Sequence, residues 1–326
     1  MIVAPMVATM GPFSDERVLV TGGAGFIGSH VTEALLERGA EVIVVDDLST
    51  GSMGNLSHLE GAEGLRMIEA DATTLPVTAL EGVTMGVHLA ALTEVAASIE
   101  DPARTVEVNV LGSVHVLEAL HKAGARSAVV ASSAAVYGEV PVPVAEDGPH
   151  RPMSPYGAGK LAVDHFVHYY ARHTDLAVCA LRFFNVYGPR QHPRSPYSGV
   201  ISVFTRAALL GEDLTINGDG GQTRDFINVT DIAKAILIAL RTPDVRGEPI
   251  NIGTGQGISI EDLAREIISV AGSPSRIRHG TDRPGDIRHS VAKIDKAESL
   301  LGFKASVPLR DGLVTTVEWM RSQQQG

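Results

Sequence analysis

Short apolar runs alternate with amphipathic stretches along the first half of the chain. Between the runs, apolar residues recur with a helical period, as in SHVTEALLERG and YGAGKLAVDHFVHYYARH. Strands that alternate with helices predict an α/β fold with a doubly wound parallel sheet. Six apolar runs, rich in β-branched residues, are typical of the buried strands of such a sheet: 17–21, 41–47, 64–71, 82–92, 126–138 and 175–188.

The pattern changes after residue 188, where prolines, glycines and arginines replace the regular alternation. Helical periods return in VISVFTRAALLGE, VTDIAKAILIAL and SIEDLAREIISVAG, and EPINIGTG predicts a short strand that rejoins the sheet. We therefore expect a first domain over residues 1–185, with a return at about 226–255. Residues 186–225 and 256–326 are expected to form a smaller lobe.

The first predicted strand ends in glycines that run directly into a helical period. Gly23, Gly25 and Gly28 match G-x-G-x-x-G, and Gly22, Gly25 and Gly28 match the looser G-x-x-G-x-x-G. Without side chains, such a turn lets a pyrophosphate approach the free N–H groups at the helix N-terminus. The next strand ends in Asp46, at about the 20-residue offset where a carboxylate reaches the ribose hydroxyls and repels a 2′-phosphate. The pattern predicts a dinucleotide site that favours NAD over NADP.

Composition limits the partners of this site. The chain has 326 residues, of which 44% are apolar and 20% charged, as in ordinary soluble enzymes with a sizeable core. A net charge of −11 argues against nucleic acid, and no apolar run approaches the about 18 residues of a membrane span. The single cysteine, Cys179, cannot form an intrachain disulfide, which fits the cytoplasm. His165 and His168 have no third ligand at suitable spacing, so no metal is expected.

Ser133, Tyr156 and Lys160 form the predicted catalytic group. Tyr156 and Lys160 lie four residues apart at the start of a helix, so they share a face, and Ser133 ends the preceding strand. A tyrosine has an ordinary pKa of about 10, and an ammonium one turn away and the helix dipole both favour its phenolate. Beside a nicotinamide, this phenol can take an alcohol proton while the hydride leaves for the cofactor.

Motifs along nearly the whole chain, from Arg17 to about Phe303, resemble the extended short-chain dehydrogenase/reductase family. They are TGGAGFIGSH, VDDLSTG, HLAA, SSAAVYGE, SPYGAGK, LRFFNVYGPRQ, DGGQTRDFINVTD and RPGDIRHS, in this order. The resemblance is to its nucleotide-sugar epimerases and dehydratases, most of all to UDP-glucose and UDP-N-acetylglucosamine 4-epimerases. It implies a Rossmann sheet with a smaller C-terminal lobe, NAD as cofactor, a UDP-linked sugar as ligand, and a homodimer formed through a helix bundle.

The resemblance also implies the site residues, by position. Arg224 and Arg283 suit a diphosphate, because guanidinium forks clamp phosphate oxygens. Asp71 has a second interpretation as a helix N-cap, and a helical Asn109 is ordinarily just exposed. Cofactor contacts are expected from Gly22, Gly25, Phe26, Ile27, Gly28, Asp46, Asp47, Ser49, Thr50, Gly51, Asp71, Ala72, Leu89, Ala90, Ala91, Asn109, Ser132, Tyr156, Lys160 and Phe183. Substrate contacts are expected from Thr93, Glu94, Ser133, Ala134, Asn185, Gly199, Val200, Thr215, Ile216, Arg224, Arg283, Asp286 and Ser290.

The mechanism implied by the resemblance is oxidation of the sugar at C4, turning of the 4-keto sugar about its bond to the diphosphate, and return of the hydride to the opposite face. Related 4,6-dehydratases carry an Asp-Glu pair after the catalytic hydroxyl, where this chain has Ala134 and Ala135, which cannot transfer protons. Ser290 stands where hexose-restricted epimerases carry a tyrosine, so we expect room for a 2-acetamido group.

Two other functions stay open at this point. Glu94 could act as an elimination base, which would make the protein a dehydratase, such as a 5,6-dehydratase of UDP-N-acetylglucosamine in antibiotic biosynthesis. The simpler interpretation of Glu94 is a solvated carboxylate at a helix entry. A non-catalytic sensor of NAD or nucleotides could use the same scaffold, because fold does not determine function.

Overall fold

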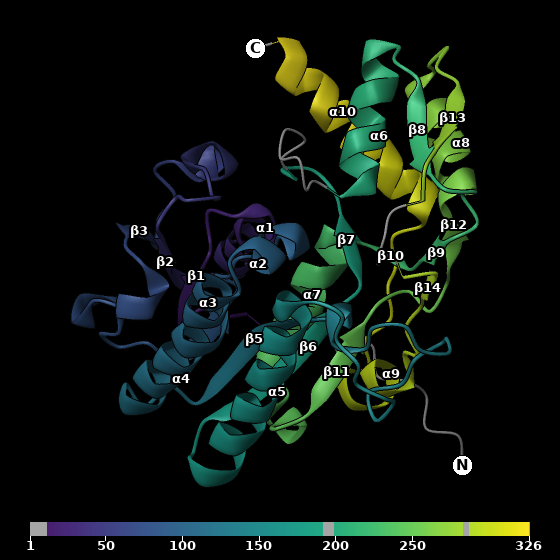
Figure 1. Cartoon of the computed structure of the whole chain (residues 1–326). Coiled ribbons are helices and arrows are strands. Elements are labelled where there is room, and N and C mark those ends of the chain that lie inside the picture. The colour runs from purple at the N-terminus through teal and green to yellow at the C-terminus, as the bar shows by residue number, and fades with distance from the viewer. Residues whose placement is uncertain (1–11, 192–198, 283–286, 326) are drawn as a thin grey trace, which may run out of the picture.

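A seven-stranded parallel sheet forms the centre of the protein. The computed structural model describes residues 12–191, 199–282 and 287–325 (Figure 1). The predicted doubly wound α/β fold is confirmed, and the expected seventh strand joins the sheet at its edge. In spatial order the strands are β11 (Pro249–Ile252), β6 (Ala177–Phe183), β5 (Ser127–Ser133), β4 (Met85–His88), β1 (Arg17–Thr21), β2 (Glu41–Asp46) and β3 (Leu65–Glu69).

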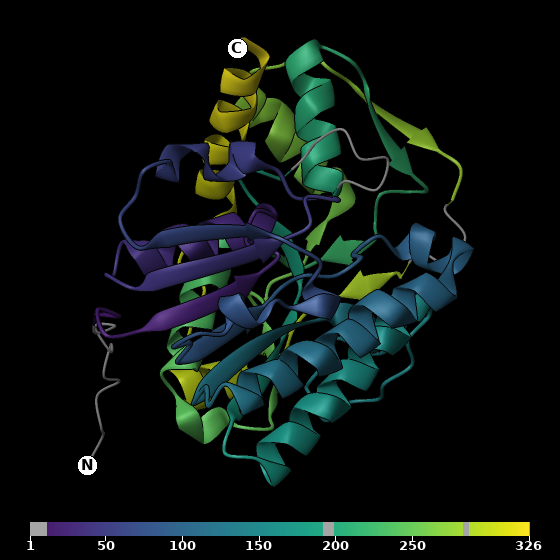
Figure 2. The same cartoon turned by 90° about the vertical axis from the view of Figure 1, so that its left-hand side faces the viewer.

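Each central strand sends alternate side chains into two separate cores. In β2, Val42 and Val44 pack in the core that contains α1 (Phe26–Leu36) and α7 (Val229–Leu240). Ile43 and Val45 point into the core that contains α4 (Gly112–Lys122) and α5 (Pro155–His173), which lie side by side in Figure 2. Both faces of the sheet are therefore covered, and this explains why the strands are apolar throughout.

A π-helical turn precedes helix α4. Between α3 (Pro102–Val106) and α4, residues Glu107–Leu111 form a π-helical turn. Such turns insert an extra residue and are frequent at functional sites. A short helix, α2 (Val95–Glu100), precedes α3 and packs against α5.

A third core holds together the elements at the upper right of Figure 1. It contains apolar side chains of α6 (Val200–Leu210), β8 (Leu214–Asn217), α8 (Ile260–Ala271) and α10 (Leu309–Gln325). Helix α9 (Asp295–Leu301) packs against the central sheet instead. The division of the chain into two lobes at the expected residues stays a prediction. The remaining strands are β7 (Asn185–Tyr187), β9 (Thr223–Arg224), β10 (Phe226–Asn228), β12 (Ile258–Ser259), β13 (Ile277–Gly280) and β14 (His289–Ser290).

None of the helices in the described ranges is long and apolar enough to cross a bilayer.

Candidate active site

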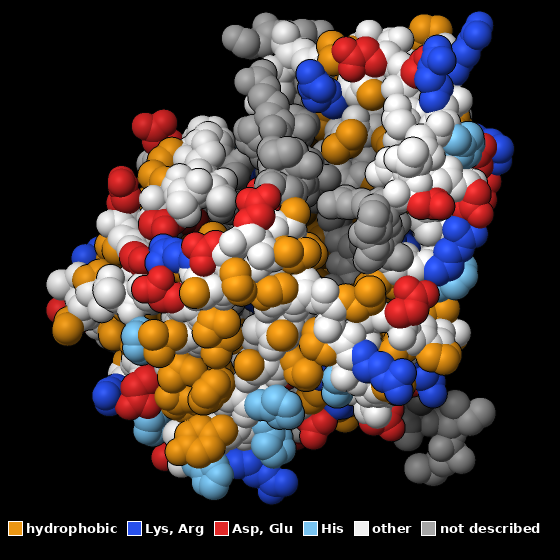
Figure 3. All heavy atoms as spheres, viewed as in Figure 1, with side chains coloured by type: hydrophobic (Ala, Val, Ile, Leu, Met, Phe, Trp, Pro, Cys, Tyr) orange, Lys and Arg blue, Asp and Glu red, His pale blue; other side chains and the backbone are white. Residues whose placement is uncertain are grey.

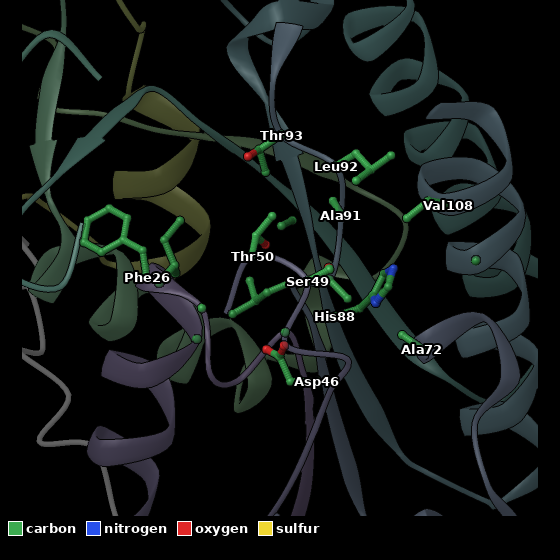
Figure 4. A pocket seen from close by; sticks show the side chains of 18 of the residues that line it. Phe26, Asp46, Ser49, Thr50, Ala72, His88, Ala91, Leu92, Thr93 and Val108 are labelled. Atoms are coloured by element: carbon green, nitrogen blue, oxygen red, sulfur yellow. The ribbon is translucent and has the colours of Figure 1, made fainter. Parts of the chain in front are cut away.

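A cavity of about 820 Å³ lies at the carboxyl ends of the central strands (Figure 4). The strand order reverses between β1 and β4, which is where doubly wound sheets bind ligands. Figure 4 shows Phe26 on one side of this cavity and Ala72 and Val108 on the other. Most of the predicted site residues line it: Gly22, Gly25, Phe26, Ile27, Gly28, Asp46, Asp47, Ser49, Thr50, Asp71, Ala72, Leu89, Ala90, Ala91, Thr93, Glu94, Ser132, Ser133, Tyr156, Lys160, Phe183 and Gly199.

The glycine turn leaves no space for side chains. Gly22 has φ +71°, and a Cβ there would lie 2.7 Å from the backbone nitrogen of Ala90. A Cβ on Gly28 would overlap the carbonyl oxygen of Gly22 and lie 2.7 Å from the Cα of Gly23. The buried hydroxyl of Ser132, on the cavity wall, has no hydrogen-bond partner within the described residues. A bare backbone cradle and an unpaired hydroxyl fit a dinucleotide with its phosphates and ribose.

Asp46 is held in place by the turn that it faces. Its carboxylate accepts hydrogen bonds from the backbone N–H groups of Ala24, at 3.0 Å, and Leu48, at 2.9 Å. Burial raises the pKa of Asp46. Gly51 does not line the cavity; a Cβ there would lie 2.6 Å from the Asp46 carboxylate. Gly51 therefore makes room for Asp46.

Asp71 is a helix N-cap that also lies at the wall of the cavity. Its carboxylate accepts from the backbone N–H of Thr73 at 2.7 Å, which caps a short 3₁₀ helix, so the N-cap interpretation is confirmed. The residue also lines the cavity.

Helix α5 brings Tyr156 and Lys160 to the cavity. The hydroxyl of Ser154 caps this helix by accepting from the N–H of Gly157 at 3.1 Å, and the N–H of Tyr156 donates to Ser98 Oγ at 3.2 Å. The Nζ atom of Lys160 donates to the carbonyl of Ala131 at 2.8 Å and lies 6.0 Å from the centroid of the Tyr156 ring. The three predicted catalytic side chains therefore meet at one wall, because strand β5 ends in Ser133.

Burial is the largest cause of the pKa shifts of both Tyr156 and Lys160. Desolvation raises the pKa of the Tyr156 phenol, and a hydrogen bond with Ser133 lowers it. Desolvation lowers the pKa of Lys160 to about 8, and the negative charge of Asp164 raises it. Lys160 and the helix dipole were expected to favour the phenolate of Tyr156, but desolvation raises the pKa of this phenol instead. Both groups are mostly protonated at pH 7.

Asn109 does not line the cavity but shapes its wall. Its side chain is 0% exposed and lies in the π-helical turn. The side-chain oxygen accepts from the N–H of Leu92, and the side-chain nitrogen donates to the carbonyl of Leu92, each at 2.8 Å. Leu92 lies on the wall, beside Ala91 and Thr93 (Figure 4). Asn109 is therefore a positioning residue for this wall rather than an exposed helical residue.

His88 connects this wall to the first strand. Ser113 Oγ donates to the carbonyl of Asn109 at 2.6 Å, so it accepts from His88 Nε2, at 2.9 Å. The other ring nitrogen therefore accepts from the hydroxyl of Thr21, at 2.7 Å. Burial, and secondarily the charge of Lys160, lower the pKa of His88 to about 3. The imidazole is thus a neutral structural link.

Replacing Asn109 by leucine is expected to lower the free energy of unfolding by about 2 to 4 kcal/mol, because both backbone groups of Leu92 lose their partner. Urea denaturation followed by circular dichroism measures this change. A midpoint equal to that of the wild type would show that water replaces the amide at no cost.

Some predicted substrate residues in the described part of the chain do not line this cavity. Arg224 pairs with Ser290 across β9 and β14, and next to it the buried carboxylate of Asp225 accepts from the N–H groups of Thr254, at 2.8 Å, and Gly255, at 3.0 Å. Arg283 and Asp286 lie outside the described residues. The other predicted residues that do not line the cavity are Ala134, in the turn after β5; Asn185, in β7; Val200, at the start of α6; and Thr215 and Ile216, in β8.

Several cavity residues had not been predicted. Leu92 and Thr73 adjoin predicted positions, so neighbourhood along the chain could have indicated them. Arg104 and Val108 are four residues apart in a helical run, and Gln191 follows a loop. No local signal marks Arg104 and Val108, because packing of distant segments brings them to the cavity. Gln191 ends the motif LRFFNVYGPRQ, which could have indicated it. In the described part of the chain, no group of three His, Cys, Asp or Glu side chains could hold a metal ion.

Comparison with known proteins identifies the family. Residues 18–253 match the NAD dependent epimerase/dehydratase family. The chain belongs to this family. The expected family is thus confirmed, and NAD, the predicted cofactor, is the cofactor on which this family depends.

Individual members of this family are similar over almost the whole chain. It is 38% identical, over 95% of its length and 100% of the relative, to UDP-glucose 4-epimerase of Mycolicibacterium smegmatis. A solved UDP-N-acetylglucosamine 4-epimerase of Methanobrevibacter ruminantium, in complex with UDP-N-acetylmuramic acid, has a TM-score of 0.91 and 37% identity, with 95% of this chain and 99% of that chain covered. UDP-glucose 4-epimerase of Thermus thermophilus, in complex with NAD, has a TM-score of 0.83 and 37% identity, with coverage of 94% and 99%.

Proposed function

We propose that the protein is an NAD-dependent nucleotide-sugar 4-epimerase that acts on a UDP-hexose or UDP-N-acetylhexosamine through a 4-keto intermediate. The observation that carries the proposal is the meeting of Ser133, Tyr156 and Lys160 at one wall of the cavity whose floor is the glycine turn. The names of the similar epimerases support the reaction type.

The residues divide the work of such a reaction. The turn of Gly22 and Gly28 would hold the pyrophosphate of NAD, and Asp46 would bind its adenosine ribose. NAD, when bound, accepts the hydride from C4 of the sugar and returns it. Tyr156 first loses its own proton to solvent; as the phenolate it then takes the proton of the C4 hydroxyl and later gives it back, and Ser133 hydrogen-bonds the same oxygen. Lys160 stabilises negative charge on the phenol as this proton moves.

The residues that follow Ser133 favour epimerisation over 4,6-elimination. Ala134 packs against an apolar cluster in the turn after Ser133, and neither it nor Ala135 has a group that transfers protons. Glu94 lines the cavity, which keeps a dehydratase as the second candidate. At the nucleotide-sugar end, the small side chain of Ser290 supports acceptance of an N-acetylhexosamine.

Incubation with UDP-N-acetylglucosamine, followed by mass measurement and proton NMR, tests the reaction. A new 4-stereoisomer of unchanged mass is expected. Loss of one water would instead indicate a dehydratase, and absence of any reaction, also with UDP-glucose, would indicate a sensor. Activity on UDP-glucose alone would contradict the role of Ser290.

We also propose a homodimer formed through the helices on one face. Apolar side chains gather over α2, α3 and α5 on the face shown in Figure 3, although such groups are ordinarily buried. Two copies that pack this face together, each with α5 and the helical run through α3, Asn109 and α4, would make a four-helix bundle and cover these side chains. The exposed members of this patch are Val95, Ile99, Val106, Met153, Phe166 and Tyr169, with Ile99 62% exposed.

The double variant Phe166→Glu with Tyr169→Glu is expected to shift the protein from dimer to monomer. Its buried carboxylates would face one another across the two-fold axis. Sedimentation velocity at micromolar concentration measures the change. The control is Val203→Glu, at an exposed position in α6 outside the patch, which should leave the dimer intact. A monomeric wild type would contradict the proposal.

A cytoplasmic location also belongs to this proposal. The support for it is the single cysteine, Cys179, which is free and buried, as suits a reducing compartment.

A further inference from the structure

Behind the cavity, the buried face of α5 carries a second charged residue in line with the catalytic pair. Asp164 follows Lys160 by one helical turn, so both side chains lie on one face of the helix. Lys160 is 4% exposed and Asp164 is 7% exposed. A charged side chain is almost never buried unless another charge compensates it. Two buried, opposite charges therefore lie one turn apart on the same face of α5.

Arg182, on β6, forms an ion pair with Asp164. Its Nε donates to Asp164 Oδ2 at 2.9 Å, and both side chains are almost completely buried. The other carboxylate oxygen, Oδ1, is buried and has no hydrogen-bond partner within the described residues. Asp164 thus has one oxygen bound to Arg182, and the charge on its unpaired oxygen can act on Lys160.

The guanidinium of Arg182 cannot move away from this position without breaking a buried network. Its Nη1 donates to the hydroxyl of Tyr137, at 2.8 Å, and to the carbonyl of Glu146, at 3.0 Å. The Tyr137 hydroxyl donates in turn to Asn251 Oδ1 at 2.6 Å. Arg182 is therefore anchored directly to Tyr137 and Glu146, and through Tyr137 to Asn251, and this anchoring fixes the position of Asp164.

We propose that the buried pair of Asp164 and Arg182 is a positioning device that sets the protonation of Lys160, with the two partners acting in opposite directions. Asp164 favours the ammonium, and Arg182 limits this effect by taking up part of the carboxylate's charge. The inference rests on the proposed function, because it concerns the lysine that assists Tyr156.

The other groups around Lys160 and Asp164 do not replace this carboxylate. Desolvation lowers the pKa of Lys160 to about 8, and Asp164 opposes this decrease. On β4, His88 is neutral, and its lowered pKa of about 3 includes repulsion from Lys160. Tyr156, on α5 itself, has a raised pKa and is neutral. The pKa of His150 is lowered, first by desolvation and then by the charge of Arg182, whereas the charge of Asp164 raises it.

Two single variants separate an electrostatic role from a merely structural one. Asp164→Asn is expected to lower the pKa of Lys160 by about one unit, because an attractive charge is lost. Arg182→Gln is expected to raise the pKa, because the carboxylate then faces Lys160 alone. The alkaline limb of the pH profile of kcat should move down in the first variant and up in the second. Both variants break the same ion pair, so structural damage alone would not shift the two limbs in opposite directions.

A direct titration makes the test independent of activity. Lysine labelled with ¹⁵N reports the pKa of Lys160 by NMR, and the missing signal of Lys160→Met gives the assignment. The matched control is Glu118→Gln, which removes a carboxylate that contacts Tyr170 on the opposite part of α5 and should leave the Lys160 titration unchanged.

The double variant Asp164→Asn with Arg182→Met covers the case in which the single variants do not fold, since replacing both members of a buried pair is often tolerated. Its Lys160 pKa should lie below that of the wild type. An unchanged Lys160 pKa in the folded variants, or shifts in the same direction in both single variants, would overturn the proposal. Opposite shifts by NMR with an unchanged kcat profile would support this proposal and contradict the assistance of Tyr156 by Lys160.

Discussion

Replacing Tyr156 by phenylalanine is expected to lower kcat by about 10²- to 10⁴-fold, the usual contribution of a general acid or base. The ring keeps its place at the start of α5, because Ser154 caps this helix and Ser98 binds the backbone of residue 156. Only the phenolic oxygen is lost, and with it the group that takes the C4 proton. The NAD content and the melting temperature should stay near those of the wild type.

Turnover of UDP-N-acetylglucosamine or UDP-glucose by the purified variant, with bound NAD measured after denaturation, checks this result. The matched control is Tyr169→Phe, because Tyr169 lies on the same helix but is exposed away from the cavity. Wild-type turnover in the Tyr156 variant with intact NAD binding would refute the assignment of the base.

Gly28→Ala is expected to destabilise the protein by about 1 to 3 kcal/mol or more, and to deplete it of NAD. A methyl group at this position would overlap the carbonyl oxygen of Gly22 and press against the Cα of Gly23. Both neighbours are backbone atoms of the turn, so relief requires the turn to move. We expect the affinity for NAD to fall by at least about tenfold, which corresponds to about 1.4 kcal/mol of binding free energy.

Fluorescence titration with NAD and urea denaturation measure the two effects. Gly54→Ala serves as the control, because the contact nearest to its Cβ is an exposed hydroxyl, Ser52 Oγ, at 3.3 Å. If Gly28→Ala bound NAD as the wild type does, the turn would not be the pyrophosphate site.

Much of this architecture follows from local sequence. Continuous apolar runs predict strands buried on both faces, and β2 sends Val42 and Ile43 into opposite cores. The glycine turn, Asp46 and the spacing of Tyr156 and Lys160 follow from the geometry of one βαβ unit and of one helix. These features were predictable because their atoms are close in the chain, where backbone geometry determines which side chains share a face.

Tertiary structure decided the features that depend on segments far apart in the chain. Asn109 is buried against Leu92 rather than exposed, since the π-helical turn directs it there. Arg182 reaches Asp164 only after β6 enters the sheet beside β5. The protonation of Tyr156 also belongs here, because helical spacing says nothing about desolvation. Spacing in the sequence decides which residues share a face of a helix. The segments that pack against this face decide how strongly its side chains are desolvated and which partners they bind.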